Sequence, residues 1–570
     1  MEARNRLLPD WFTQIRTGQI KLPRFQRYES WSHSNITNLL ESVVQGLPAG
    51  AALVLRVGDH EKFISREVVG APTVAAQPTE HLLDGQQRLT ALWRSLHDNY
   101  EDRTYFVYFE NGGEDTRPRI YGQPRWKTQD GRMRPAWADA PKGINDRGYI
   151  PLRLLRPDET GQNVRAWCRA ATAEPEGSER LEDRINELRQ RVLTYNIPFL
   201  ELPATTPKDV ALDVFINMNT SYVRLTSFDI IVAQFEEATG ESLHDLVTQL
   251  NERVPVLALY MEPSDLVLEV AALREDKPPT QVSYQQLGLE RLFNEWQQVI
   301  GGVAQAVEFL EEEHVYDAER LPTVAVIRVL AALSEHIPTS PDKLGNARSL
   351  LRKYLWRASL TARYEAAAAT ASFQDFRGLR DALGGLDTPI PLFDEARYPV
   401  PTGDSLLNAR WPKGRDTLAR GILNVTIRAG ADDIADGTPA SRGQLAKREY
   451  HHLFPASLLE RDGQLTSREI YRALNCALIS WRTNRTIAAK PPIAYLRERI
   501  DGADLGMEEI ARRLATHYVP FGELNAGGYD KLGDPTRRGD QLRTDYEAFL
   551  RARADLLLPA ISALCDGREP

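Results

Sequence analysis

Two adjacent histidines, His451 and His452, and two asparagines, Asn475 and Asn484, lie within one short stretch of the chain. Cutting a phosphodiester requires a base for the attacking water and neutralisation of charge on the phosphoryl oxygens. One histidine could supply the base while its neighbour holds a divalent metal ion. The stretch therefore predicts a nuclease site. Two ordinary histidines on a surface loop are the alternative interpretation.

A small unit of two strands and a helix would position these groups. We expect the histidines at the end of one strand, where a turn directs the two rings to different tasks. The apolar run Ala477-Leu478-Ile479 follows Asn475, and the residues from Trp481 to Lys490 have a helical pattern. A side-chain oxygen of Asn484 could complete a metal site from that helix. The amide of Asn475 could brace the loop that carries the histidines.

This ordered set of residues, with Pro455 after the histidine pair and Lys490-Pro491-Pro492 after the helix, resembles the HNH nuclease family of ββα-metal fold. The resemblance implies that His452 is the general base and that Asn475 supports the loop. It also implies that His451 and Asn484 are metal ligands. Asn484 stands where the family often has a histidine. A neutral oxygen ligand suits Mg²⁺ or Mn²⁺ better than a softer metal.

A second polar motif, Asp84-Gly85-Gln86-Gln87-Arg88, follows an apolar pair, Leu82-Leu83. We predict that the pair ends a strand, that Asp84-Gly85 forms a tight turn, and that a helix follows. The turn would place Gln86, Gln87 and Arg88 at a helix N-terminus, where free amides and the helix dipole favour an anion. Arg88 could pair with a phosphate, and Asp84 could bind a metal or position a water. Alternatively, Asp84 is only an N-cap.

Two further segments have residue types suited to a nucleotide. In Pro23-Arg24-Phe25-Gln26-Arg27, rings could stack while Gln26 reads an edge and an arginine grips phosphate. Packing of the aromatic residues against the core is the alternative. Asn217, Asn219 and Arg224 lie between two predicted helices and suit a nucleotide sugar or phosphate, although loop and cap chemistry explains them equally well.

Together, the motif at Asp84–Arg88 and the segment Pro23–Arg27 resemble the N-terminal domain of GmrSD-type modification-dependent (type IV) restriction endonucleases and the related SspE nucleases. The resemblance implies a ParB/sulfiredoxin-like fold that binds and hydrolyses a nucleoside triphosphate (GTP, UTP or ATP), with Asp84 and Arg88 catalytic. It also implies a C-terminal HNH domain that cuts DNA. The expected nucleotide-binding residues are Arg24, Gln26, Arg27, Gly85, Gln86, Gln87, Arg88, Asn217, Asn219 and Arg224.

The composition limits the class of protein. A chain of 570 residues is too long for one core and suggests roughly three or four domains. Its three cysteines are far apart, so no disulfide framework or zinc ribbon is expected. The net charge of −9 argues against a nonspecific DNA coat, but a local basic groove would suffice for DNA binding. No apolar run is long enough for a membrane span, so we expect a cytoplasmic protein without a membrane partner.

The chain is predicted to be an α+β multidomain protein, predominantly helical. We expect a nucleotide-binding and modification-sensing domain over residues 1–240, a helical scaffold over 241–400, and a nuclease domain over 401–570. Residues 111–148 are rich in Gly, Pro and Arg and lack apolar periodicity. They are predicted to form an exposed excursion, either facing DNA or simply solvated.

The predicted function is an NTP-dependent, metal-dependent endonuclease that restricts modified foreign DNA such as phage DNA. Its partners would be double-stranded DNA, a nucleoside triphosphate and possibly a second copy of the chain. We hypothesise that the nucleotide shifts the chain between restrained and cutting-competent arrangements. One alternative is a nucleotide-gated DNA-binding regulator whose HNH-like unit is structural. Another is transfer of a nucleotidyl or phosphoryl group to a protein.

Overall fold

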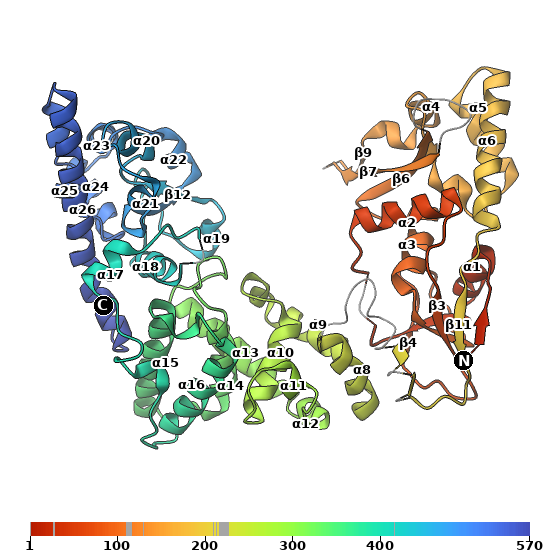
Figure 1. The fold of residues 1–570 in the computed structure, drawn as a ribbon, viewed down its shortest axis with the longest axis horizontal. Helices are drawn as coiled ribbons and strands as arrows, with labels where there is room; N and C mark the ends of the chain where they lie inside the picture. Colours follow the sequence, from red (N-terminus) through yellow and green to blue (C-terminus); the bar gives the residue numbers. More distant parts are fainter. Residues whose placement is uncertain are drawn as a thin grey trace. The chain divides into compact units, whose positions relative to one another are not determined.

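The chain forms two compact units, Met1–His244 and Asp245–Pro570 (Figure 1). The computed structural model describes residues 2–26, 29–109, 117–128, 130–208, 210–211, 214–215, 227–414 and 416–570. Helices predominate and small sheets occur in both units, which confirms the predicted α+β, predominantly helical class. The division into three domains at residues 240 and 400 stays a prediction.

A six-stranded mixed sheet with the order β1-β11-β3-β5-β2-β4 forms the centre of the first unit. Its central strands, β3 and β5, are buried nearly throughout, as expected for strands covered on both faces. β11 pairs parallel to β3, and β2 pairs parallel to β5, whereas β3 and β5 are antiparallel. The strand bounds are β1 Glu2–Arg4, β2 Ile20–Pro23, β3 Ala52–Arg56, β4 Ser65–Arg66, β5 Glu80–Asp84 and β11 Phe199–Leu202.

Amphipathic helices pack around this sheet. The first one, α1, buries Leu8, Trp11, Phe12 and Ile15, which recur at helical spacing. The next, α2, ends at Gly46, whose φ of 71° is left-handed, as expected for a glycine that terminates a helix. The helices of this unit include α1 Leu8–Arg16, α2 His33–Gln45, α3 Gln86–Leu96, α4 Pro141–Asn145, α5 Gly161–Ala171, α6 Pro175–Leu193 and α8 Ser227–Thr239. The predicted ParB/sulfiredoxin-like identity stays a prediction.

The expectation of an irregular excursion over residues 111–148 is wrong for the part that the structure describes. β7 (Pro118–Pro124) pairs antiparallel with β6 (Arg103–Phe109) along its whole length, and β10 (Ile150–Pro151) joins them. β8 (Trp126–Lys127) and β9 (Met133–Arg134) form a second, two-stranded sheet. The strand β7 was not predicted because it contains proline and glycine, which are unfavourable in strands. Arg119 and Arg125, two of the arginines considered for DNA, form ion pairs with Glu41 and Asp98.

The second unit begins with helices that pack together with the C-terminal elements. Glu313, which is almost fully buried, accepts hydrogen bonds from Trp356 Nε1 and Arg352 Nε, both at 2.9 Å, and pairs with Arg428 at 3.1 Å. Trp356 also belongs to the core that contains the C-terminal strands. The main helices here are α9 Leu243–Arg253, α10 Pro263–Arg274, α13 Trp296–Glu312, α14 Ala325–Leu333, α15 Pro341–Leu360, α16 Ala368–Leu383 and α18 Thr417–Arg428.

A two-stranded sheet, β12 (Arg448–His452) and β13 (Cys476–Ser480), is followed directly by the helix α22 (Trp481–Ile487). The last helix, α26, lies along the edge of the unit away from α22 (Figure 1) and packs Phe549 against Phe454. The helices of this part include α20 Ala456–Arg461, α21 Ser467–Ile470, α23 Pro492–Asp501, α24 Gly506–Ala515, α25 Phe521–Leu524 and α26 Pro535–Cys565. The expected order of strand, strand and helix is therefore present.

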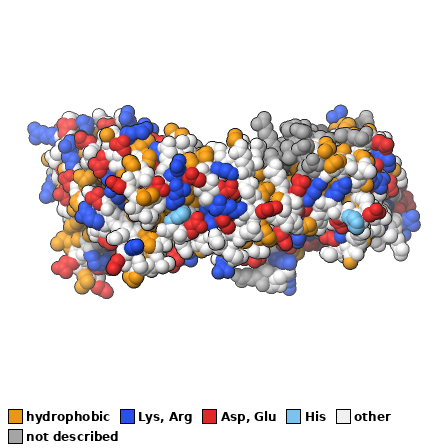
Figure 2. All heavy atoms as spheres, turned by 90° about the horizontal axis from the view of Figure 1, so that it is seen from below, with side chains coloured by type: hydrophobic (Ala, Val, Ile, Leu, Met, Phe, Trp, Pro, Cys, Tyr) orange, Lys and Arg blue, Asp and Glu red, His pale blue; other side chains and the backbone are white. Residues whose placement is uncertain are grey.

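The surface carries charges of both signs. On the face drawn in Figure 2, Lys and Arg side chains are interspersed with Asp and Glu over the described part of each unit. This mixture agrees with the sequence argument against a basic coat. Among the described residues, no helix is both long and apolar enough to cross a bilayer.

Candidate functional site

The two adjacent histidines lie at the end of β12, where His451 is opposite Ala477 and His452 is opposite Cys476. Successive side chains of a strand point to opposite faces of the sheet. The two rings are therefore directed to different sides. His451 is only 3% exposed, whereas His452 is partly exposed. This geometry allows the two imidazoles to perform separate tasks, as the sequence predicted.

The inner histidine faces the helix. Nδ1 of His451 lies 2.8 Å from Oδ1 of Asn484 on α22. Two neighbouring ligands of an octahedral ion with bonds of about 2.1 Å lie roughly 3 Å apart, so this spacing fits a Mg²⁺ or Mn²⁺ ion. No cluster of three or more His, Cys, Asp or Glu occurs within the described ranges. A metal ion here would consequently retain water or phosphate oxygens as its other ligands.

Burial keeps both imidazoles neutral. It lowers the pKa of His451 to about 4, against the opposing effect of its contact with Asn484. Burial also lowers the pKa of His452 to about 4, and neighbouring His451 adds to this effect. Both rings are thus uncharged at pH 7. A neutral ring is the form that binds a metal ion or accepts a proton.

The outer histidine is held by aromatic packing. The ring of His452 stacks on Trp411, with 4.0 Å between centroids and 15° between planes, and meets the ring of Tyr471 edge-on at 4.8 Å. Its Nε2 atom is buried and has no hydrogen-bond partner among the described residues. Neither aromatic residue was predicted for the site, because neither belongs to the polar motif. The packing fixes the ring while leaving a nitrogen available.

Asn475 braces the loop after the histidines. Its side chain is fully buried, and Oδ1 accepts a hydrogen bond from the Phe454 N–H at 2.8 Å. Nδ2 donates to the carbonyls of Phe454 and Ile470 at 3.1 and 3.3 Å. The amide thus joins the residues after β12 to the end of α21. The structure shows the contacts that the predicted loop support requires.

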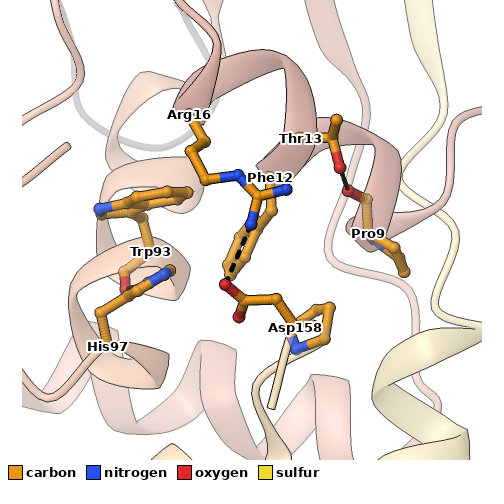
Figure 3. Close-up of a pocket in the computed structure, with 8 residues that line it drawn as sticks. Pro9, Phe12, Thr13, Arg16, Trp93, His97 and Asp158 are labelled. Atoms are coloured by element: carbon orange, nitrogen blue, oxygen red, sulfur yellow. Dashed lines mark hydrogen bonds and ion pairs between the residues drawn. The ribbon is translucent and has the colours of Figure 1, made fainter. Parts of the chain in front are cut away.

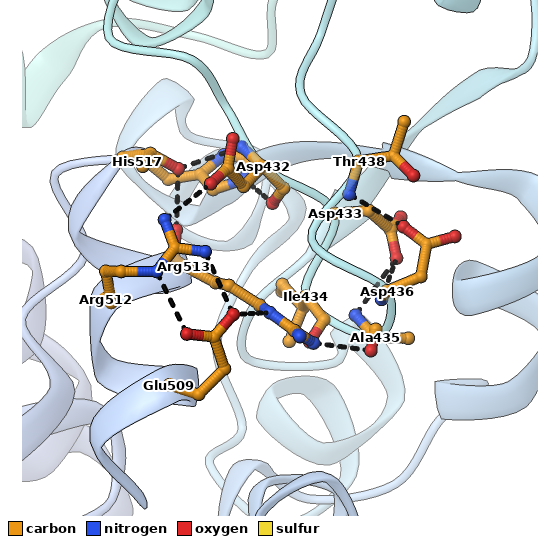
Figure 4. A network of polar contacts seen from close by, with 11 residues as sticks. Asp432, Asp433, Ile434, Ala435, Asp436, Thr438, Glu509, Arg512, Arg513 and His517 are labelled. Atoms are coloured by element: carbon orange, nitrogen blue, oxygen red, sulfur yellow. Dashed lines mark hydrogen bonds and ion pairs between the residues drawn. The ribbon is translucent and has the colours of Figure 1, made fainter. Parts of the chain in front are cut away.

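A buried carboxylate, Asp433, holds the start of α22. Figure 4 shows the same carboxylate with the N–H groups of its own loop, those of Ala435 and Asp436. Asp433 accepts hydrogen bonds from the Ser480 N–H at 2.6 Å and from Thr483 Oγ1 at 2.5 Å. Burial alone would raise the pKa of Asp433, but the hydrogen bonds from Thr483 and Ser480 outweigh it and lower the pKa. Because α22 carries Asn484, this carboxylate determines where that amide lies. This role could not be predicted, because Asp433 lies far along the chain from Ser480 and Thr483.

Beside this network, His517 is expected to make stability depend on pH. Its buried Nε2–H donates to the Asp432 carbonyl at 2.8 Å, and burial lowers its pKa to about 4. Between pH 6.5 and 4 the unfolded chain binds a proton that the folded chain excludes, so stability is full above 6.5 and falls with pH. At pH 5 the expected loss is about 2 kcal/mol from this residue. Urea unfolding at pH 7 and pH 5 measures this loss. If the free energy of unfolding fell by as much in His517→Gln as in the wild type, the assignment to His517 would be wrong.

Glu449 orients the amide of Asn484. Its carboxylate, on the same face of β12 as His451, accepts a hydrogen bond from Asn484 Nδ2 at 2.7 Å. This contact leaves Oδ1 directed at His451. The alternation of side chains along a strand, two residues apart on one face, is the sequence signal that could have identified it.

We therefore expect Glu449→Ala to raise the Mn²⁺ concentration needed for half-maximal DNA cleavage by roughly 10- to 100-fold, because the amide can then rotate its nitrogen toward His451. Glu449→Gln keeps an acceptor, so the Mn²⁺ concentration that it needs for half-maximal cleavage should stay within a few-fold of the wild-type value. A metal dependence unchanged by Glu449→Ala would show that the amide is oriented without this carboxylate.

In the first unit, the predicted strand, turn and helix at Asp84–Arg88 are present. β5 ends at Asp84, Gly85 has a φ of 94°, and α3 begins at Gln86. The helix has no side-chain cap, so the interpretation of Asp84 as an N-cap is wrong. Instead, its carboxylate lies 3.2 Å from Arg88 Nη2. The guanidinium also donates to the carbonyls of Ala49 and Ala51, which fastens the turn to the start of β3.

Two buried glutamines lie next to this turn. Gln26 Nε2 donates to the carbonyls of Leu82 and Leu83 at 2.7 and 2.8 Å. Its Oε1 and the Nε2 of Gln86 are buried without a partner among the described residues. Buried amide atoms ordinarily have hydrogen-bond partners. These atoms therefore offer one acceptor and one donor to a ligand at the turn.

The other predicted nucleotide-binding residues are placed less completely. Arg24 is exposed after β2, and Gln87 Oε1 accepts a hydrogen bond from the Ser30 N–H at 3.0 Å. Four predicted residues lie outside the described residues: Arg27, Asn217, Asn219 and Arg224.

The conformation of Gly85 supports a prediction. Its φ of +94° is strained for other residues, and an added Cβ would lie 3.1 Å from Ala52 Cβ. Gly85→Ala should lower the free energy of unfolding by roughly 1–3 kcal/mol and weaken nucleotide binding. Gly148 also has a positive φ but open space around it, so Gly148→Ala measures the backbone cost alone. Thermal melts and nucleotide titrations compare the two. Equal effects of Gly85→Ala and Gly148→Ala would show that the close approach to Ala52 contributes nothing.

One small pocket of the first unit lies at the opposite end of α3 (Figure 3). Phe12, Trp93 and His97 line it, and the Arg16–Asp158 ion pair, at 3.1 Å, lies across it. Its volume of about 80 Å³ is far below the few hundred that ligand pockets usually have. We therefore assign no nucleotide to it.

Comparison with known proteins identifies the class to which the first unit is similar. Residues 8–236 match the family described as GmrSD restriction endonuclease, N-terminal domain. The match confirms the predicted GmrSD resemblance for this part of the chain and supports a restriction-nuclease role with DNA as substrate. Over its whole length the chain is similar to the uncharacterized protein MJ0686 of Methanocaldococcus jannaschii. The two are 20% identical, and the alignment covers 96% of each.

Proposed function

We propose that the chain is a metal-dependent endonuclease that restricts modified foreign DNA and cuts it with an HNH-type site in the second unit. The observation that carries the proposal is the arrangement around β12. His451 Nδ1 and Asn484 Oδ1 converge at 2.8 Å on one side, while His452 is held separately against Trp411. Base and metal ligands are the two functions that hydrolysis of a phosphodiester needs.

Each residue has a distinct part in this reaction. Neutral His452 accepts the proton of the water that attacks phosphorus. His451 and Asn484 would hold Mg²⁺ or Mn²⁺, which when bound neutralises charge on the phosphoryl and leaving oxygens. Asn475 keeps the loop after His452 in place, and Asp433 fixes the start of α22 through Ser480. Glu449 directs the oxygen of Asn484 toward His451.

The first unit is proposed to bind a nucleoside triphosphate at the Asp84–Arg88 turn and to sense the modification. The amide atoms Gln26 Oε1 and Gln86 Nε2, which have no hydrogen-bond partner in the described part of the chain, support a ligand there. Arg88 already donates to Ala49, Ala51 and Asp84, so phosphate binding would replace or share some of these contacts. Nucleotide binding would then control cutting. If Asp84→Ala and Arg88→Ala left both NTP turnover and DNA cutting unchanged, the proposal that nucleotide binding at this turn controls cutting would be wrong.

The test is cleavage by the full-length protein. It is incubated with Mg²⁺ or Mn²⁺, with and without GTP, UTP or ATP, on unmodified plasmid and on glucosylated phage DNA. We expect cutting that needs the metal, is lost with EDTA, differs between the two DNAs and responds to nucleotide. Absence of metal-dependent cutting on every substrate would favour the alternative, a nucleotide-gated DNA-binding regulator with a structural HNH-like unit.

A further inference from the structure

A basic and aromatic surface lies beside the candidate nuclease site. Trp481, the first residue of α22, is 38% exposed, and the Arg482 and Arg485 guanidinium carbons lie 5.5 and 4.9 Å from its ring centroid. The exposed residue Lys447 is adjacent, because its carbonyl accepts a hydrogen bond from the Trp481 N–H at 3.0 Å. We call these four residues the α22 platform.

Several other arginines of this unit form ion pairs. Arg442 is paired with Glu311, and Arg512 and Arg513 are both paired with Glu509. By contrast, Lys447, Arg482 and Arg485 have no carboxylate within ion-pair distance among the described residues. On a chain with a net charge of −9, such a group is a local positive patch that suits a polyanion.

The platform is built on the helix that carries a proposed metal ligand. Thr483 and Ile487 are buried on the inner face of α22. Trp481, Arg482 and Arg485 are exposed on the same helix, whereas Lys447 directly precedes β12. Asn484 is three residues after Trp481, and residues at this spacing are neighbours on a helix surface. A strand of DNA lying along the platform would therefore run past the Asn484–His451 pair.

We propose that the α22 platform binds the phosphate backbone of the DNA strand that is cut and delivers it to His452. This inference rests on the proposed function. The two guanidiniums contact phosphates, and their cation–π contacts with Trp481 hold them in position before DNA arrives. Lys447 extends the charge toward β12. Because the platform contacts backbone, it would act on modified and unmodified DNA alike.

The test measures binding without cleavage, in full-length protein that carries His452→Ala. The probe is a short, fluorescein-labelled, unmodified DNA duplex, and anisotropy is recorded across a series of KCl concentrations. The triple variant Lys447→Gln, Arg482→Gln, Arg485→Gln should weaken binding by roughly 10- to 100-fold and reduce the slope of log K against log salt by about 2 to 3. The control triple removes equal charge from η9 (Gly528–Lys531) and α26: Lys531→Gln, Arg537→Gln and Arg551→Gln.

Trp481→Ala should weaken binding a few-fold with the salt slope unchanged, because it removes no charge. Normal binding by the platform triple, or an equal loss in the control triple, would overturn the proposal. Circular dichroism confirms that each variant is folded. The outcomes separate the two proposals. If the wild type never cuts DNA and the platform variants lose binding, the nuclease proposal and the delivery to His452 fail, and the platform remains a DNA-binding surface. If the wild type cuts DNA and the platform variants bind normally, the platform proposal fails.

Discussion

Replacing His452 by alanine is expected to lower the rate of DNA cleavage by roughly 10²- to 10⁴-fold, the usual contribution of a general base. The variant loses the ring that stacks on Trp411 at the end of β12, but it keeps His451, Asn484 and the contacts of Asn475. Metal and DNA binding should therefore be retained. Single-turnover cleavage, with DNA binding measured separately, gives the size of the effect.

Two controls distinguish a missing base from a disturbed fold. Added imidazole should restore part of the cleavage by His452→Ala if the missing group is a base. Trp411→Phe keeps an aromatic ring beside the histidine and should cut at close to the normal rate. Cleavage by His452→Ala at the normal rate would show that another residue is the general base. A wild type that binds DNA without cutting it would favour the alternative of a DNA-binding regulator.

The second large effect is expected for Asn475→Ala, both on cleavage and on stability. The change leaves the N–H and the carbonyl of Phe454 without this side-chain partner in a buried site, while the Ile470 carbonyl keeps its hydrogen bond from the Arg472 N–H. At about 1–3 kcal/mol for each unsatisfied group, and with partial relaxation, the free energy of unfolding should fall by roughly 3–5 kcal/mol. The loop after His452 should also shift, so cleavage should fall at least a hundredfold below the wild type, roughly as for loss of the base.

Asn424→Ala is the matched control for this variant. Asn424 lies on α18 and is buried to a similar degree. Its Nδ2 donates a hydrogen bond to the Arg320 carbonyl at 2.8 Å. It should lower stability by about 1–2 kcal/mol and leave cleavage intact at a temperature where both proteins are folded. Urea unfolding and cleavage assays compare the pair. If Asn475→Ala cut DNA as well as Asn424→Ala, the loop would not need this brace.

The sequence predicted the local parts of both candidate sites because their signals are close together. His451, His452, Asn475 and Asn484 lie on two strands and a helix of one short stretch, and the turn at Gly85 carries its own conformational requirement. The helix that begins at Gln86 was predicted for the same reason, since its start follows directly from the turn.

Features that depend on distant pairing could not be predicted. Trp411 and Asp433 reach the site only through tertiary packing, and nothing in their own neighbourhoods marks them. The contacts of Arg88 with the Ala49 and Ala51 carbonyls depend on the pairing of β3 with β5. β7 was missed because Pro118 and Gly122 are unfavourable in strands. Gly122 is needed there, since an added Cβ would lie 3.1 Å from the Tyr105 ring.

The buried carboxylate of Glu313 has a consequence for how such proteins can be rearranged in evolution. It joins α13, α15 and α18 through Trp356, Arg352 and Arg428, and Trp356 shares a core with the strands of the cutting site. A gene fragment that encoded residues 401–570 alone would leave Arg428 without its buried partner and would expose that core. The segment that can be inherited as a working module is therefore larger than the segment that performs the chemistry.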